Sequence, residues 1–288
     1  MSGAQPAKKD RSGPTALVGR SNLFLRVVTS LLLAPLAIAV SYWGGLGFHF
    51  FWSIAALIVL WEWDTLVCEH DRNPVLTIGA VALIGSSLLL AFDWVGTAAV
   101  LVALGLFGVA TLASSVRRGW CAAGLVYAAA LMMAPVVLRH DEALGFAAIM
   151  FMFTVVWLTD ITAYFVGRAA GGPKLLARVS PNKTWSGALG GMLAAVIGGV
   201  VLAKLFGIVN LAAIGMVAVV LSVVSQAGDL LESAIKRKFG AKDASGLIPG
   251  HGGLMDRLDG FLTAVVAAAL IGLARGGFDA PARGLMVW

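Results

Sequence analysis

The sequence predicts an all-α, polytopic integral membrane protein with about nine transmembrane helices and active-site loops on the cytoplasmic side. Hydrophobic residues make up 59% of the 288 residues and charged residues only 12%, a composition far from that of a soluble domain. Uncharged runs of 17 to 35 residues recur along the chain, and about 20 apolar residues suffice to cross a bilayer. Lysine and arginine gather in alternate connections, which is typical of membrane proteins.

The chain divides into three regions by composition. Residues 1–22 are rich in Gly, Pro, Ser and Lys and predict a disordered cytoplasmic tail. A cleaved signal peptide over residues 1–41 is the alternative, although its polar lead is long. Residues 23–138 carry few polar groups inside their helices and form the predicted N-terminal helical scaffold. Residues 139–288 form the predicted catalytic membrane region.

The nine predicted helices follow the uncharged runs. The first run, residues 27–61, carries Gly44, Gly45 and Gly47 near its middle, so it predicts two helices joined by a tight turn. The last helix is predicted over residues 258–274. Each remaining run predicts one helix, at 73–92, 94–116, 119–138, 143–159, 184–203 and 205–228.

The positive charges predict the orientation. A cytoplasmic N-terminus followed by nine alternating helices places 17 of the 21 Lys and Arg residues on the cytoplasmic side and leaves 4 outside. The positive-inside rule favours this topology, with an external C-terminus and the bacterial inner membrane as the expected location. Topology also accounts for most of the net charge of +6. Nucleic acid is not an expected partner, because no basic run carries interleaved aromatic residues.

The same orientation bears on the few polar residues of the N-terminal half. Glu62 and Asp64, flanked by tryptophans, fall near a cytoplasmic helix end, where acids are expected to stay in contact with water. Cys68 and Cys121 also fall at cytoplasmic ends, so a structural disulfide is not expected. Neither cysteine has the spacing of a metal ligand.

The sixth predicted helix ends in a polar stripe. Asp160 follows the uncharged run and shares one helical face with Tyr164 and Arg168. An acid at that depth is costly unless it is paired or wet, so Asp160 is a candidate site residue. An internal ion pair or a helix-packing contact is the alternative.

The connection over residues 171–187 carries helix-capping residue types beside a lysine. A loop that leads into a helix N-terminus with a lysine next to it suits an anion. The residues are Ser180, Asn182, Lys183 and Thr184. An ordinary capped, basic cytoplasmic loop is the alternative.

The eighth predicted helix carries polar residues at steps of three and four, which form one stripe. Such a seam on a membrane helix must face protein or water rather than lipid. The stripe consists of Ser222, Ser225, Gln226, Asp229, Glu232, Ser233 and Lys236.

Residues 229–259 hold the densest set of charges, five acids beside five bases. Acids and bases in one loop suggest a divalent metal with phosphate, because carboxylates hold Mg²⁺ and cations hold the phosphate oxygens. Asp256 and Asp259 share one side of the start of the last helix. Alone they could balance its dipole, but with Asp229 on the neighbouring helix a shared metal is the better interpretation.

A longer motif runs through the same stretch. It reads Ser233-x-Ile235-Lys236-Arg237 and, after four residues, Lys242-Asp243-x-Ser245-x-x-Ile248-Pro249-x-His251-Gly252-Gly253-Leu254-x-Asp256-Arg257-Leu258-Asp259. This resembles the signature of the phosphatidate cytidylyltransferases, or CDP-diacylglycerol synthases, with every constrained position filled. Asp160 and residues 180–184 also resemble family features, so the likeness covers the chain from about residue 157. Ser186 departs from the family, where Glu or Gln is more usual, and it receives no role.

The resemblance implies a reaction of CTP with phosphatidate that releases pyrophosphate and CDP-diacylglycerol for phospholipid biosynthesis, with Mg²⁺ as cofactor. A second cation and a homodimer are left open. The resemblance implies metal ligation by Asp229 and Asp256, with Asp259 and Asp160 as weaker candidates. The nucleotide-binding set is Ser180, Asn182, Lys183 and Thr184. The catalytic set is Asp229, Lys236, Arg237, Lys242, Asp243, His251, Asp256, Arg257 and Asp259.

Two alternatives from other classes share part of this pattern. A CDP-alcohol phosphotransferase would also use a membrane, a metal and a cytidine nucleotide, but its Asp-Gly-x-x-Ala-Arg pattern is absent from this sequence. A membrane anion transporter commonly shows an internal repeat with interrupted helices in two halves. Here the charges are concentrated in the C-terminal half.

Overall fold

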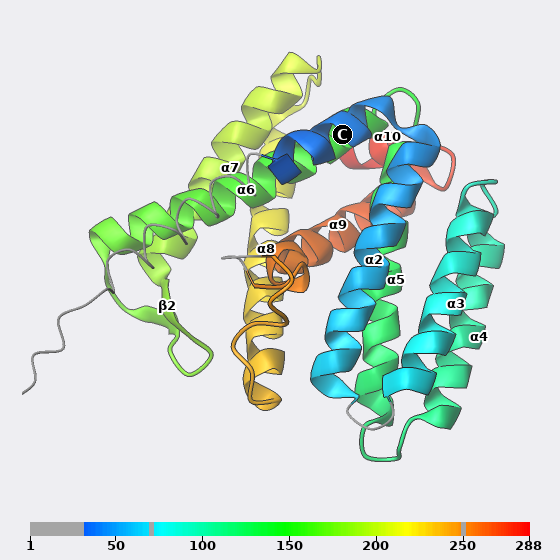
Figure 1. Cartoon of the computed structure of the whole chain (residues 1–288). Helices are drawn as coiled ribbons and strands as arrows, with labels where there is room; N and C mark the ends of the chain where they lie inside the picture. The colour runs from blue at the N-terminus through cyan, green and yellow to red at the C-terminus, as the bar shows by residue number, and fades with distance from the viewer. Residues whose placement is uncertain (1–31, 69–71, 249–251) are drawn as a thin grey trace, which may run out of the picture.

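The computed structural model describes residues 32–68, 72–248 and 252–288 and shows a bundle of helices with one small two-stranded sheet (Figure 1). Among these described residues, eight helices are long and apolar enough to cross a membrane, and the shorter apolar helix Leu32–Trp43 precedes them. This confirms an all-α, polytopic membrane protein with about nine helices. The long helices are α2 (Gly45–Val67), α3 (Arg72–Leu90), α4 (Val95–Leu112), α5 (Arg118–His140), α6 (Gly145–Ala170), α7 (Trp185–Leu205), α8 (Leu211–Lys238) and α9 (Met255–Gly276).

The break in the first apolar run lies at Gly44, as the glycines predicted. Gly44 and Gly45 have φ angles of 65° and 56°, which are unfavourable for residues with a Cβ atom. Arg139 of α5 covers this turn, because its Nε donates to the carbonyl oxygen of Ser41 at 2.8 Å. A Cβ atom on Gly44 would lie 2.6 Å from the Arg139 guanidinium. The turn therefore requires glycine for both its conformation and its contacts.

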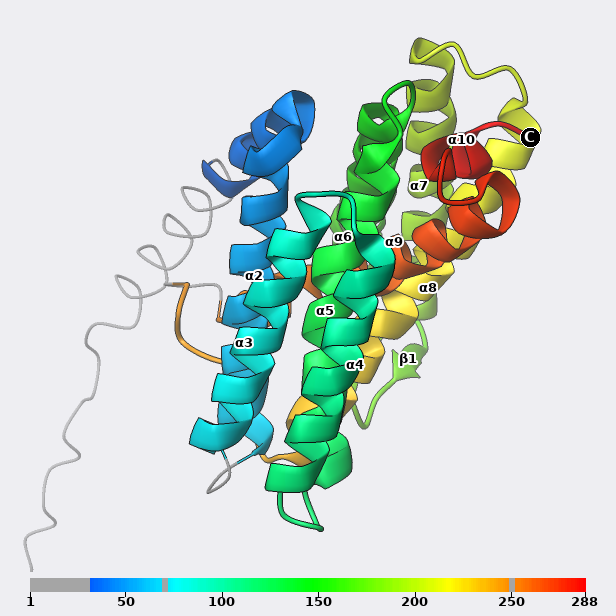
Figure 2. The ribbon, with the colours of Figure 1, turned by 90° about the vertical axis from the view of Figure 1, so that its right-hand side faces the viewer.

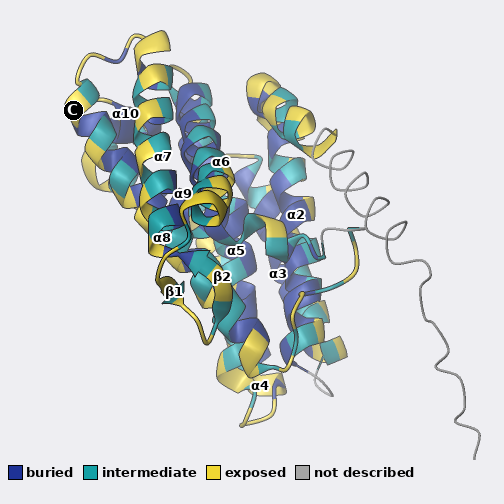
Figure 3. Ribbon diagram, turned by 90° about the vertical axis from the view of Figure 1, so that its left-hand side faces the viewer, coloured by how far each residue is buried: buried dark blue, intermediate teal, exposed yellow. Residues whose placement is uncertain are grey.

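The helices form two groups that meet at α9. Helices α2 to α5 pack against one another, and α6 to α8 pack side by side, while α9 contacts α2, α5, α6 and α8. Figures 1 and 2 show α9 crossing between the two groups, with the short helix α10 (Pro281–Met286) beside its C-terminal end. Buried residues concentrate on the inward faces of α2 and α5 (Figure 3). The start of α9 is thus reached from both halves of the chain.

Helices α6 and α7 approach each other along a seam of glycines. A Cβ atom on Gly187 would lie 2.6 Å from the carbonyl oxygen of Ala163, and one on Gly191 would lie 2.5 Å from that of Thr159. Small residues allow such close backbone contact between membrane helices. The seam fixes Asp160 on α6 relative to the start of α7.

The polar stripe of α8 faces the interior of the protein, as predicted. Ser222, Ser225 and Glu232 are fully buried. The hydroxyl groups of Ser222 and Thr159 of α6 lie 2.8 Å apart. On α6, Tyr164 and Arg168 share one face as predicted, since the Arg168 guanidinium donates to the Tyr164 hydroxyl at 2.8 Å, and both side chains are exposed.

The connection between α6 and α7 is more ordered than the loop that the sequence predicted. Strands β1 (Lys174–Leu176) and β2 (Ser180–Thr184) form an antiparallel hairpin in which Lys174 pairs with Thr184. The Thr184 side chain then accepts a hydrogen bond from the Gly187 amide at 3.1 Å and caps α7. Capping was predicted from the residue types, whereas the strand pairing was not.

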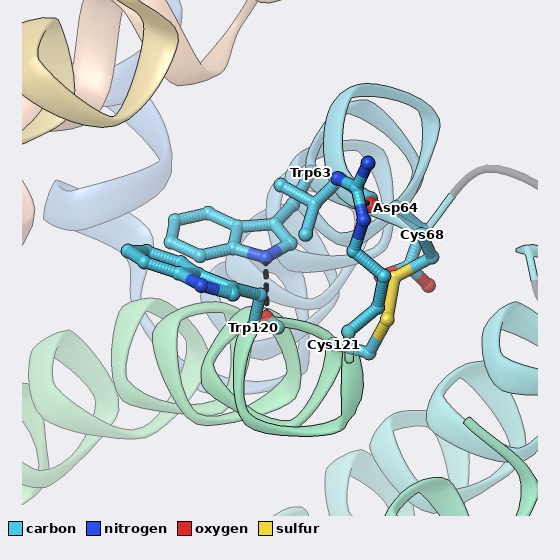
Figure 4. Close-up of a disulfide and its surroundings, with 7 residues drawn as sticks. Trp63, Asp64, Cys68, Trp120 and Cys121 are labelled. Carbon is cyan, nitrogen blue, oxygen red and sulfur yellow. Dashed lines mark hydrogen bonds between the residues drawn. A yellow bond between two sulfur atoms is a disulfide. The ribbon is translucent and has the colours of Figure 1, made fainter. Parts of the chain in front are cut away.

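The C-terminal end of α2 and the N-terminal end of α5 correct two expectations from the sequence. Cys68 and Cys121 form a disulfide (Figure 4), so the prediction of no disulfide was wrong. The two helices pack directly, and the Trp63 indole donates to the Trp120 carbonyl oxygen at 2.8 Å beside the cysteines. Asp64 is fully buried there rather than wet, and Glu62 is equally buried.

Candidate active site

Three segments bring their charged side chains together at one end of the bundle: the hairpin before α7, the C-terminal part of α8 and the start of α9. Figure 1 shows the hairpin and the connection between α8 and α9 at the same lower end. The connections α3–α4, α5–α6 and α7–α8 lie at the opposite end. The site therefore lies on the side that carries most of the lysines and arginines.

Lys183 forms the first ion pair of the site. Its Nζ, on β2, donates to Oδ2 of Asp229 on α8. Both side chains are about a quarter exposed, at 28% and 26%. The Asp229 carboxylate also accepts a hydrogen bond from Ser233 one turn later on α8. The pair thus joins the predicted nucleotide loop to the predicted metal ligand.

Lys236 forms the second ion pair, with Asp256 of α9. Its Nζ also lies 2.8 Å from Glu232 Oε1, one turn earlier on α8. The Lys236 side chain is only 10% exposed and that of Glu232 only 1%. Burial of this kind is costly for a charge unless opposite charges accompany it. Glu232 and Asp256 together supply that compensation.

Asp256 also organises the connection between α8 and α9. Its Oδ2 accepts hydrogen bonds from the Ala244 amide at 2.8 Å and from the Gly253 amide at 2.7 Å. A Cβ atom on Gly252, whose φ is 83°, would lie 2.8 Å from the same oxygen. Glycine at this position therefore allows the backbone to approach the carboxylate.

Three carboxylates from three helices are near enough to repel one another electrostatically. Asp160 of α6 and Asp259 of α9 each interact electrostatically with Asp229 of α8. Asp160 also interacts with Lys183 and Arg257. Among the described residues, no three Asp, Glu, His or Cys side chains converge closely enough to enclose a metal ion by themselves. The arrangement is an open cluster of acids with cations beside it.

The remaining predicted residues surround this cluster. Arg237, Lys242 and Asp243 are exposed at the end of α8 and just beyond it, and Arg237 donates to the Ala241 carbonyl oxygen. Ser180 and Asn182 lie on β2, where Ser180 is half-buried and Asn182 is exposed. His251 and the tail over residues 1–22 lie outside the described residues, so their predicted roles stay predictions.

Two acids in the site received no role from the sequence. Glu232 was noted only as part of the polar stripe, yet it is buried against Lys236. Glu62 of α2 accepts hydrogen bonds from the start of α9. The available signal was the depth of Glu62 in an apolar helix, because ionisable residues within a membrane are commonly functional.

An apolar pocket opens beside the charged cluster, with a volume of about 520 Å³. Its walls come from α2, α5, α8 and α9 and include Trp120, Tyr127, Leu231, Ile235 and Leu262. On α8, Leu231 and Ile235 directly precede the buried Glu232 and Lys236 in sequence. The same two turns of α8 therefore line the apolar cavity and carry the buried ion pair.

Comparison with known proteins gives consistent results. The sequence matches the cytidylyltransferase family over residues 24–274. It is 44% identical over 257 residues to a phosphatidate cytidylyltransferase of Brucella abortus, covering 88% of this chain and 94% of that protein. It is 31% identical over 256 residues to one of Staphylococcus haemolyticus, covering 83% and 94%. A Haemophilus influenzae relative of the same name is 40% identical over 131 residues, covering 44% and 46%.

Proposed function

The chain belongs to the cytidylyltransferase family, and we propose that it transfers a cytidylyl group from CTP to phosphatidate at the polar cluster between α6, β2, α8 and α9. The products are CDP-diacylglycerol and pyrophosphate. One observation carries the placement: Lys183 and Lys236 are each held by an aspartate, Asp229 and Asp256, at the same end of the bundle. The family match over most of the chain favours this function over a CDP-alcohol phosphotransferase or an anion transporter.

The reaction needs little proton transfer from the protein. A phosphate oxygen of phosphatidate attacks the α-phosphorus of CTP and forms a new P–O bond. The bond from that phosphorus to the oxygen bridging the β-phosphorus breaks, and pyrophosphate leaves with the electron pair. The attacking phosphate monoester is already largely ionised at neutral pH. The protein must therefore position two polyanions and balance their charge.

The carboxylates of the cluster suit Mg²⁺. This ion is usually held by one or two carboxylates together with substrate phosphates, so a protein cage of three acids is not required. We propose Asp229 and Asp256 as ligands, with Asp160 and Asp259 in the same acidic cluster as further candidates. When bound, Mg²⁺ neutralises charge on the transferred and leaving phosphates. A second cation would add to the same effect.

The cations have separate proposed tasks. Lys183 lies beside the N-terminus of α7, where backbone amides favour negative charge, so it is suited to the CTP phosphates. Lys236 lies beside the apolar pocket and is suited to the phosphate of the lipid. In both cases phosphate would replace the aspartate as the partner of the lysine.

The apolar pocket is the proposed site of the acyl chains. It lies within the membrane-spanning parts of α5, α8 and α9, where the chains of a membrane lipid already reside. A phosphatidate molecule bound there would place its headgroup near Lys236. We accordingly place the reaction at the cytoplasmic surface of the bacterial inner membrane, where the positive-inside rule puts this end of the bundle.

The position of the isotope label in CTP tests the proposed cytidylyl transfer. Purified protein is incubated with phosphatidate, Mg²⁺ and CTP labelled at the α-phosphorus, and label in the lipid fraction is measured. CTP labelled at the β- or γ-phosphorus serves as the control, because that label must appear in pyrophosphate and not in lipid. Lipid labelling by the control, or none from α-labelled CTP, would contradict the proposed transfer.

A further inference from the structure

Glu62 connects the N-terminal half of the protein to the catalytic region. It lies on α2, is fully buried, and accepts hydrogen bonds from residues more than 180 positions later in the chain. Its Oε1 accepts from the Leu254 amide at 2.9 Å and from the Ser245 hydroxyl. Its Oε2 accepts from the Met255 amide at 2.7 Å. One carboxylate thus binds both sides of the connection between α8 and α9.

These contacts make Glu62 the cap of α9. The first amides of a helix have no partners within the helix and require an acceptor. Leu254, at the N-cap position, provides no side-chain cap. Glu62 supplies the missing acceptors from another helix, and its negative charge suits the positive end of the helix dipole. Asp256 and Asp259 follow within the first turn and a half of that helix.

The connection between α8 and α9 also packs closely against the Glu62 carboxylate. A Cβ atom on Gly253 would lie 2.5 Å from Glu62 Oε1 and 2.9 Å from Oε2. The Ser245 hydroxyl bound to Glu62 also accepts from the Leu247 amide at 3.1 Å. Only glycine at position 253 lets the connection reach the carboxylate without displacing it.

We propose that Glu62 is a positioning residue for cytidylyl transfer. By capping α9 and holding Ser245, it fixes where Asp256 and Asp259 stand relative to Asp229. This inference rests on the proposed function, because that function takes these aspartates as ligands or candidate ligands of Mg²⁺. Glu62 acts through the connection and the helix, and its carboxylate is occupied by the three donors described above.

The role requires a carboxylate rather than any polar group of the same size. Three donors converge on the two oxygens of Glu62. In Glu62→Gln one oxygen becomes an amide nitrogen, which donates and so opposes a donor. A buried donor left without an acceptor is costly, so the start of α9 should detach or shift.

The test compares Glu62→Gln with Asp64→Asn in the full-length protein. Asp64 is equally buried two residues later on α2, but it lies beside Cys68 and makes none of the contacts to α9. In Glu62→Gln, we expect faster hydrogen exchange at the Leu254 and Met255 amides without substrate. We also expect kcat to fall by about 10- to 100-fold, the range seen for groups that orient metal ligands. In Asp64→Asn, amide exchange at Leu254 and Met255 and the kcat of the folded protein should both equal those of the parent.

Gly253→Ala provides a second, independent variant that leaves Glu62 intact. Its methyl group should push the carboxylate away and reproduce both effects, which keeps the test decisive should Glu62→Gln fail to fold. Unchanged exchange at Leu254 and Met255, or faster exchange with kcat within about twofold of the parent, would overturn the positioning role. Faster exchange in Glu62→Gln, combined with a parent protein that does not label phosphatidate, would instead contradict the proposed function while supporting the capping of α9 by Glu62.

Discussion

Lys183 on β2 forms an ion pair with Asp229 on α8, although the two residues are 46 positions apart in the chain. The pair joins the hairpin before α7 to α8, which carries more buried polar residues than any other helix in the described part of the chain. Because both side chains remain partly exposed, an anionic substrate and a cation can compete for them. The pair therefore indicates how the site holds itself together before substrates arrive.

Replacing Lys183 should weaken the use of CTP. Lys183→Ala removes a charge-assisted contact worth about 1.5 to 3 kcal/mol, which corresponds to a loss of roughly 10- to 150-fold in kcat/KM for CTP. The loss falls in KM if the contact is equally strong in bound CTP and in the transition state, and in kcat if it tightens as pyrophosphate leaves. Steady-state kinetics with varied CTP measure both.

Lys174→Ala is the matched control for that variant. Lys174 is an exposed lysine on the neighbouring strand of the same hairpin, so it removes the same charge from the same loop. Its kinetics should equal those of the parent. Kinetics of Lys183→Ala that match those of Lys174→Ala would remove the hairpin from the nucleotide site.

The proposed metal ligands should be sensitive to loss of charge alone. Asp229→Asn and Asp256→Asn keep the side-chain shape but remove a charge, and each should lower turnover by at least about 100-fold, more than the loss typical of groups that only orient ligands. Asp93→Asn at the opposite end of the bundle is the control. Asp93 is an exposed residue of the α3–α4 connection with a φ angle of 61°, and asparagine tolerates that backbone conformation equally well. Near-normal turnover of either site variant at ordinary Mg²⁺ concentration would show that its residue is not a metal ligand.

Filling the apolar pocket should affect the lipid and not the nucleotide. Ala130→Phe adds a ring to the pocket wall on α5, and we expect KM for long-chain phosphatidate to rise several-fold. KM for CTP should stay constant, and phosphatidate with short acyl chains should be affected less. Equal KM values for long and short chains in the variant and the parent would argue against acyl chains in this pocket.

The predicted orientation has a direct consequence for the C-terminus. Trp288 lies at the end of the bundle that carries the α3–α4, α5–α6 and α7–α8 connections (Figure 2). A reporter fused after Trp288 should therefore behave as external, and one inserted between α4 and α5 as cytoplasmic. A cytoplasmic signal from the C-terminal fusion would require an even number of membrane crossings.

Most of the fold could be predicted from the sequence because the bilayer imposes a length on each helix. Uncharged runs marked the helices, and Gly44 marked the break in the longest run through its backbone conformation. The polar stripe of α8 could be assigned to protein or water because lipid excludes such residues. These are local properties, which a single sequence carries in full.

The errors arose where two distant segments decide the outcome together. The cytoplasmic location predicted for Cys68 and Cys121 argues against a disulfide, whereas their pairing depends on how α2 packs against α5. Glu62 was expected to contact water, whereas its hydrogen-bond partners lie about 190 positions later in the chain. No local sequence pattern predicts contacts at that separation. The hairpin before α7 is short, and its pairing follows from the positions of the two helices that it joins.

The glycine seam between α6 and α7 also has a consequence for how the chain assembles during synthesis. In lipid, helix pairing gains nothing from hiding apolar surface and depends on close contact between backbones. The seam at Gly187 and Gly191 provides this contact as soon as α7 has entered the bilayer. The two helices and the hairpin between them are then a finished unit, presenting Asp160 and Lys183 together before Asp229 and Asp256 have left the ribosome.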